Sequence, residues 1–133
     1  MAHLTLEYSA NLRAGGDLGG LCARLAACLA AQRDGAAVVF PIGGIRVRAI
    51  PCEDYCIADG APDAAFVHAI LKLGAGRSAA VRTAAGTAVF ELIKQHFAAQ
   101  FAAHGLALSL ELIECSEAGT WKHNNLHARI RRT

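Results

Sequence analysis

The first group in the chain that could do chemistry is its own amino terminus. Residues 1–8 read MAHLTLEY, and apolar and polar residues alternate from Leu4 to Tyr8, which predicts a half-buried β-strand almost from the first residue. An α-amino group has a pKa of about 8, so burial or nearby cations turn it into a usable general base. Ala2 is small enough for Met1 to be removed, leaving the amine at the start of the strand. The alternative is a strand that starts early and has a solvated amine.

Two arginines beside flexible glycines form the second group. The segment FPIGGIRVR places Arg46 after Gly43 and Gly44, and KLGAGRS places Arg77 at a turn before a predicted helix. Arginine offers a bidentate fork to carboxylates, and helix N-termini attract anions. The pair predicts a small anionic substrate with more than one carboxylate, the alternative being two solvated arginines. GAGRS lacks the Lys-Ser/Thr ending of a phosphate-binding loop, which argues against nucleotides.

Two weaker constellations concern zinc and nucleic acid. Cysteine and histidine pairs at four-residue offsets have a zinc-like spacing: Cys52 with Cys56, and His123 with His127. The two pairs lie far apart in the sequence, so we expect no metal. The basic end of the chain, RIRR at residues 129–132, could contact nucleic acid. No basic patch interleaved with aromatic residues accompanies it, so we expect no nucleic-acid partner.

The elements that must position these groups follow the order strand, helix, strand, repeated once. We predict strands at residues 3–9, 37–41, 45–50, 64–76 and 106–115, and long helices at 18–32 and 79–104. The apolar stripe of the second helix includes Phe97 and Phe101. Right-handed crossovers then predict an α/β (α+β) fold, in which two β-α-β units form a four-stranded sheet with both long helices on one face. The uncovered face would be available for subunit contacts.

Length and composition fit one domain of 133 residues. We divide it into a first unit at residues 1–50, a second at 63–115 and a tail at 116–133. Hydrophobic residues make up 54% of the chain, and the net charge of +2 is too balanced to indicate nucleic acid. We find no signal peptide and no apolar segment long enough to span a bilayer, so we expect a cytoplasmic protein without a membrane partner. The five cysteines are expected to be free thiols.

Taken in order, a set of motifs carries a family resemblance: FPIGGIRVR, ADG, AFVH, KLGAGRS, FELIKQHF, ALSLEL and WKHNNLHA. Over residues 2–128 the chain resembles the 5-carboxymethyl-2-hydroxymuconate isomerases of the tautomerase superfamily. The resemblance implies a homotrimer of fused β-α-β units without metal or cofactor. It also implies an isomerase that interconverts keto and enol forms of an unsaturated tricarboxylate in the breakdown of homoprotocatechuate.

The same resemblance suggests roles for three residues. In the family, the amine of an amino-terminal proline is the base, and two arginines bind carboxylates and polarise the carbonyl. Carried over, these roles fall to Ala2, Arg46 and Arg77, with Ala2 standing where the family has proline. A primary amine can still take a proton or condense with a carbonyl. If Met1 is retained, however, the Ala2 nitrogen is an amide and cannot act as a base.

A second hypothesis therefore stands beside the enzyme: a diverged, non-catalytic trimeric relative that keeps the arginine pocket and binds a small anion without turnover. The sequence assigns no role to three residues of the tail motif, Lys122, Asn124 and Asn125.

Overall fold

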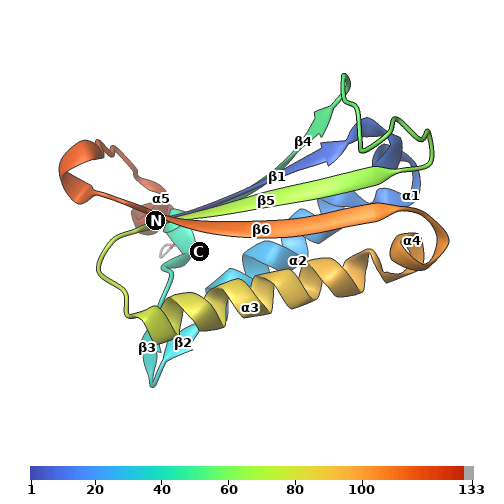
Figure 1. Cartoon of the computed structure of the whole chain (residues 1–133). Coiled ribbons are helices and arrows are strands. Elements are labelled where there is room, and N and C mark those ends of the chain that lie inside the picture. The colour runs from blue at the N-terminus through green and yellow to red at the C-terminus, as the bar shows by residue number, and fades with distance from the viewer. Residues whose placement is uncertain (131–133) are drawn as a thin grey trace.

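The computed structural model describes residues 1–130, and its central element is one mixed four-stranded sheet (Figure 1). The strand order is β4 (Ile45–Cys52), β1 (Ala2–Ser9), β5 (Ala65–Gly74) and β6 (Leu106–Cys115). β1 runs parallel to β4, β5 runs parallel to β6, and the central β1–β5 pair is antiparallel. Each parallel pair is joined through a helix, so the predicted arrangement of two β-α-β units is confirmed.

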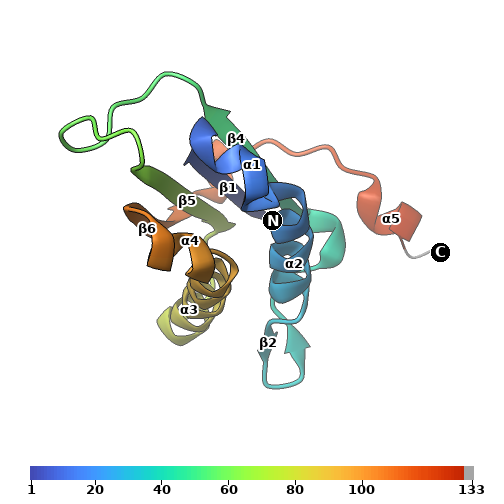
Figure 2. The ribbon, with the colours of Figure 1, turned by 90° about the vertical axis from the view of Figure 1, so that its right-hand side faces the viewer.

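Two long helices, α2 (Leu18–Ala30) and α3 (Ala79–His96), cover the same face of the sheet (Figures 1 and 2). Each begins at a side-chain cap. The Asp17 carboxylate accepts a hydrogen bond from the Gly20 amide at 3.2 Å, and the Ser78 hydroxyl accepts one from the Val81 amide at 3.2 Å. Such caps satisfy backbone donors that the first helical turn leaves free.

Shorter elements join the main ones. They are η1 (Ala10–Leu12), α1 (Arg13–Gly16), β2 (Arg33–Asp34), β3 (Ala37–Val38), η2 (Ile42–Gly44), α4 (Ala98–Ala103), η3 (Glu117–Gly119) and α5 (Leu126–Ile130). All five cysteines are free thiols. No helix within residues 1–130 is long and apolar enough to cross a membrane.

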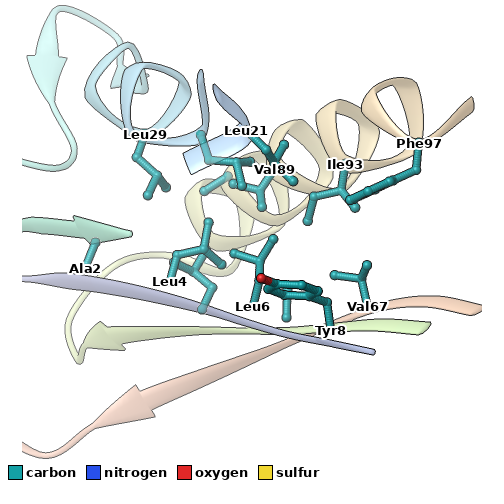
Figure 3. Packing of buried hydrophobic residues seen from close by; sticks show 14 of the residues in the cluster. Ala2, Leu4, Leu6, Tyr8, Leu21, Leu29, Val67, Val89, Ile93 and Phe97 are labelled. Carbon is teal, nitrogen blue, oxygen red and sulfur yellow. The ribbon is translucent and has the colours of Figure 1, made fainter. Parts of the chain in front are cut away.

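The core lies between the sheet and the two helices (Figure 3). Alternate residues of β1 point into it, because successive side chains of a strand face opposite sides. Leu4 and Leu6 are fully buried there, against Leu21 of α2 and Val89 and Ile93 of α3. Full burial of one such side chain contributes about 1.5–3 kcal/mol. This layer therefore fixes β1, and with it the amino terminus, in the middle of the sheet.

The predicted strand at 37–41 is wrong beyond its first two residues. Only Ala37 and Val38 are paired, in a two-stranded hairpin with β2. The chain then turns inward because the Phe40 ring is buried in the core, at 1% exposure. Arg77 holds the turn by donating a hydrogen bond to the Val39 carbonyl at 3.0 Å.

The predicted helix at 79–104 is interrupted at Phe97. This residue has φ −100° and ψ 17°, and its fully buried ring lies edge-on to His96 with 4.8 Å between ring centroids. The Phe101 amide still donates a hydrogen bond to the Phe97 carbonyl at 2.8 Å across this break. The Phe101 ring is nevertheless 62% exposed, and its prediction as a core residue is wrong.

Candidate active site

The amino terminus lies at one end of the sheet, held by the first residue of β1. Ala2 is fully buried and pairs with Ile45 on one side and Leu73 on the other. The Met1 amine that precedes it has a pKa below its ordinary value, firstly because burial disfavours its charged form. The positive charges of Arg77, Lys122 and Arg46 lower the pKa further, in that order. A terminal amine in this place is neutral more often than an ordinary terminal amine, and the neutral form can accept a proton.

Two cavities meet at this amine. One, of about 410 Å³, is lined by Arg77 and by residues of the turn after β5 and of the tail. The other, of about 290 Å³, is lined by Arg46 together with His3, Gly44 and a different part of the tail. Met1 and Lys122 line both. The sequence predicted that both arginines bind one small anion. The structure places them in adjoining cavities that share Met1 and Lys122.

Arg77 is held in a fixed orientation at its cavity. Its guanidinium donates hydrogen bonds to the Gly74 carbonyl at 3.0 Å and to the Val39 carbonyl at 3.0 Å. Its Cζ lies 4.7 Å from the centroid of the Phe40 ring, within the range of a cation–π contact. Because a guanidinium has five N–H groups, these contacts orient the side chain and leave donors for a carboxylate.

Arg46 is positioned by the turn before β4. Its Nη1 donates a hydrogen bond to the Gly44 carbonyl at 3.2 Å. A Cβ on Gly44 would lie 3.3 Å from both the nitrogen and the Cα of Met1, which is tighter than an ordinary contact. The glycine therefore lets the turn approach the amino terminus closely, as the GGIR segment suggested.

The tail closes over the same turn. Asn124 donates a hydrogen bond to the Gly43 carbonyl at 3.1 Å, and α5 lies against η2. A Cβ on Gly43 would come within 2.7 Å of the His127 ring and 2.9 Å of its backbone nitrogen. Asn125 directly precedes α5, and its backbone carbonyl accepts a hydrogen bond from the Arg129 amide at 3.2 Å.

Lys122 is the functional candidate that the sequence reasoning missed. It lines both cavities, and its charge is the second of the three that lower the pKa of the amine. Its neighbour Trp121 also lines the Arg46 cavity and is 88% exposed. The only signal in the sequence is the WKHNNLHA motif, because 120 residues separate Lys122 from Ala2 and only the fold brings them together.

The zinc hypothesis finds no support in the fold. His123 and His127 line the Arg46 cavity, near the start of β4, whereas Cys52 ends this strand. Seven residues of strand separate the two places by about 23 Å. Within residues 1–130 no group of three or more potential ligands could hold a metal. Of the basic RIRR segment, residues 131 and 132 lie outside the described part of the chain.

Comparison with known proteins decides the family. The sequence model of 5-carboxymethyl-2-hydroxymuconate isomerase matches residues 2–130. The chain belongs to this family. A 5-carboxymethyl-2-hydroxymuconate Delta-isomerase of Escherichia coli is 44% identical over 128 residues, covering 96% of this chain and 98% of the relative. The resemblance that the motifs suggested is thus confirmed.

Solved structures agree with this assignment to the 5-carboxymethyl-2-hydroxymuconate isomerase family. A family member from Deinococcus radiodurans R1 is 49% identical, with a TM-score of 0.89 and coverage of 98% of this chain and 94% of that one. A second 5-carboxymethyl-2-hydroxymuconate delta-isomerase is 34% identical, with a TM-score of 0.90 and coverage of 98% and 93%. The native fused 4-OT, at 18% identity and a TM-score of 0.67 with coverage of 98% and 99%, shares the fold.

Proposed function

We propose that this family member is an isomerase that interconverts enol and keto forms of a 2-hydroxymuconate-type di- or tricarboxylate in homoprotocatechuate breakdown. The observation that carries the proposal is a terminal amine of lowered pKa between two cavities that each contain an arginine. Membership of an isomerase family favours turnover over the alternative of an anion binder without activity.

In this proposal the base is the amine of Ala2 after removal of Met1. Removal takes away one of the two residues that both cavities share, so the new amine faces both arginines. The amine takes the proton of the enol hydroxyl, whose electrons form the carbonyl while the conjugated double bond shifts. The ammonium then returns the proton to the distant carbon, which leaves the enzyme unchanged. The reverse direction uses the same groups.

Arg77 and Arg46 act as carboxylate ligands, and the arginine nearer the reacting oxygen stabilises the developing enolate charge. Fixed cationic donors of this kind act where charge develops in the transition state. Lys122 adds a third positive charge, which both attracts the polyanion and keeps the amine neutral. No step in this scheme needs a metal or a redox cofactor.

The proposal includes a cytoplasmic homotrimer. The helices cover only one face of the sheet, and the edge strands β4 and β6 have free edges within residues 1–130. A fused 4-OT of the same fold, 18% identical with a TM-score of 0.61, is itself a symmetric trimer. Sedimentation analysis of the purified protein tests this part directly, and a monomer would contradict it.

The decisive experiment compares chains with and without Met1. Protein is prepared from cells with active or inhibited methionine aminopeptidase, and intact mass identifies the first residue. We expect turnover of 2-hydroxymuconate only from the chain that begins with Ala2. Equal activity of the two forms would rule out the Ala2 amine as base. Ala2→Pro, which restores the family's secondary amine, should raise the rate. If the chain that begins with Ala2 binds the anion but does not turn it over, the result supports the alternative of a non-catalytic anion binder.

A further inference from the structure

The tail of the chain supplies different walls to the two cavities beside the amino terminus. Its lining residues up to Thr120 belong to the Arg77 cavity, and those from Trp121 onward belong to the Arg46 cavity. Lys122 alone among the tail residues lines both. Both cavities are large compared with a carboxylate group, so charge and hydrogen-bond donors, rather than volume, distinguish the two.

The two walls differ in charge. Glu117 is the one acidic residue that lines the Arg77 cavity, and no acidic residue lines the Arg46 cavity. Glu117 forms no ion pair within residues 1–130, so its carboxylate repels further negative charge in the Arg77 cavity. The Arg46 cavity instead contains His123 and His127, and an imidazole can donate a hydrogen bond from a ring nitrogen. The Arg46 cavity is therefore better suited to several carboxylates.

The two arginines differ in the donors that they have left for a ligand. Arg77 uses two guanidinium N–H groups, in its hydrogen bonds to the Gly74 and Val39 carbonyls. Arg46 uses one, in its hydrogen bond to the Gly44 carbonyl. Because each guanidinium has five N–H groups, Arg46 retains more donors for bound carboxylates than Arg77 does.

His127 is held in place at the Arg46 cavity. The Asn124 side chain donates a hydrogen bond to the Gly43 carbonyl at 3.1 Å and accepts one from the Leu126 amide at 2.7 Å. The imidazole lies against this turn, since a Cβ on Gly43 would be 2.7 Å from its Nδ1 and a Cβ on Gly44 would be 4.0 Å from its Cε1. No hydrogen bond within residues 1–130 uses the His127 ring, so its N–H is available to a ligand.

The proposed isomerase reaction indicates which end of the substrate lies in which cavity. In a 5-carboxymethyl-2-hydroxymuconate the enol hydroxyl stands beside a single carboxylate, whereas the other end carries two. Of the two arginines, Arg77 lowers the pKa of the terminal amine more strongly, so its charge acts more strongly where the amine takes the enol proton. The end with one carboxylate therefore fits the Arg77 cavity, and the end with two fits the Arg46 cavity.

We propose that His127 is a specificity-determining residue that selects a tricarboxylate. Arg46 binds one carboxylate of the doubly charged end, and His127 donates a hydrogen bond to the other. Glu117 opposes the reverse orientation, in which two carboxylates would enter the Arg77 cavity. This inference rests on the proposed function of the same site. Because His127 comes from the tail and not from a strand, its role is compatible with a trimer that covers the helix-free face of the sheet.

The test uses two saturated ligands that cannot tautomerise. Adipate has one carboxylate at each end of a muconate-length chain, and pentane-1,2,5-tricarboxylate adds a carboxymethyl group at one end. Calorimetric titration of the full-length protein that begins with Ala2 gives both dissociation constants, and we expect the tricarboxylate to bind more tightly.

Variants of two histidines show whether this preference depends on His127. His127→Phe should weaken tricarboxylate binding about tenfold, because it removes a donor to a charged group, and should leave adipate binding within about twofold. His127→Asn keeps an N–H donor and should retain part of the preference. The matched control His104→Phe, at an exposed histidine in the cavity beside Ala65, should change neither constant.

Amide chemical shifts of the isotope-labelled protein test the orientation and need no variant of His127. The difference between the two saturated complexes should centre on residues 46 and 127, and in Glu117→Gln it should extend to residue 77. The proposal is overturned if the wild type binds both ligands equally, if His127→Phe and His104→Phe change the affinity ratio alike, or if the shift difference centres on residues 77 and 117.

These results are separate from those that test the isomerase. A protein that selects the tricarboxylate through His127 without turning over a hydroxymuconate would support this inference and contradict the proposed activity. An active isomerase without the preference would do the reverse.

Discussion

The two β-α-β units begin alike but differ in the chemistry of their first strands. Each parallel strand pair starts with a buried alanine, Ala2 in β1 and Ala65 in β5, and these starts lie at opposite ends of the sheet (Figure 1). The Ala65 nitrogen is an amide that donates to the Gly105 carbonyl at 2.8 Å. Ala2 follows the chain terminus, where three cations converge on the amine.

The cavities at the two ends differ in the same way. The cavity beside Ala65 has a volume of about 200 Å³. It is lined by Asp63, by His104 and by side chains that carry no charge, and none of its lining residues is an arginine or a lysine. The cavities beside the amino terminus contain Arg46, Arg77 and Lys122. Repetition of the fold thus produces two similar strand ends, whereas the chain terminus and the cations make only one of them reactive.

The largest effect on stability is expected at the end that lacks the amine. Phe97→Ala removes a fully buried ring and should lower the free energy of unfolding by about 3–5 kcal/mol. Phe101→Ala, at an exposed ring of the same type, should change it by less than about 0.5 kcal/mol. Denaturant unfolding measures both. A changed kcat/KM in the folded fraction of Phe97→Ala would contradict the inference that this end of the sheet takes no part in the reaction.

The largest effect on activity is expected at the other end. Arg77→Ala should lower kcat/KM by about 10²–10³, the effect of removing one oxyanion donor. Arg77→Lys should have a kcat/KM between those of Arg77→Ala and the wild type, because lysine keeps the positive charge but cannot donate the two parallel hydrogen bonds of a guanidinium. His104→Ala, in the Ala65 cavity, is the control and should keep wild-type kinetics. Steady-state assays measure kcat/KM of each variant. An unchanged kcat/KM in Arg77→Ala would show that Arg77 does not contribute to the active site.

Glycines at the two ends provide a matched pair. Gly43→Ala places a Cβ 2.7 Å from the His127 ring, so the tail must shift, at a cost of about 1–3 kcal/mol. Gly105→Ala meets only Ala64, at 3.8 Å, and should be tolerated. We expect Gly43→Ala alone to reduce activity, through displacement of Lys122. Thermal unfolding and kcat/KM are measured for both variants. Equal melting temperatures and equal kcat/KM values would show that the close contact between Gly43 and the tail is not required.

The smallest effect concerns the pH profile. The Ala2 amine that removal of Met1 exposes should experience the same burial and cations that lower the pKa of the Met1 amine. Since only the neutral amine accepts a proton, kcat/KM should fall as the pH drops through this lowered pKa. Lys122→Gln removes one of the charges that lower this pKa. The pKa therefore rises, and the acidic limb of the profile moves to higher pH. Lys94→Gln, an exposed lysine paired with Glu91 on α3, is the control and should leave the limb in place. An unchanged limb in Lys122→Gln would mean that Lys122 does not act on the base.

The parts of the structure that depend on local patterns were predictable. Alternation in β1, the caps Asp17 and Ser78, and the glycines before Arg46 are all local signals, and the structure contains each of them. The errors fall where tertiary packing outweighs propensity. Burial of Phe40 ends the short strand at Val38, and burial of Phe97 breaks the second helix.

The sequence by itself determined the family, the two β-α-β units and the three candidate groups, Ala2, Arg46 and Arg77, because motifs and periodicity are written in neighbouring residues. Only the tertiary structure decided how these groups meet. It placed the two arginines in adjoining cavities that share Met1, brought Lys122 back to the amine across 120 residues, and aligned His3, Arg48 and Lys72 on one face. Distances between such residues depend on strand order and register, which long-range packing sets and no local pattern encodes.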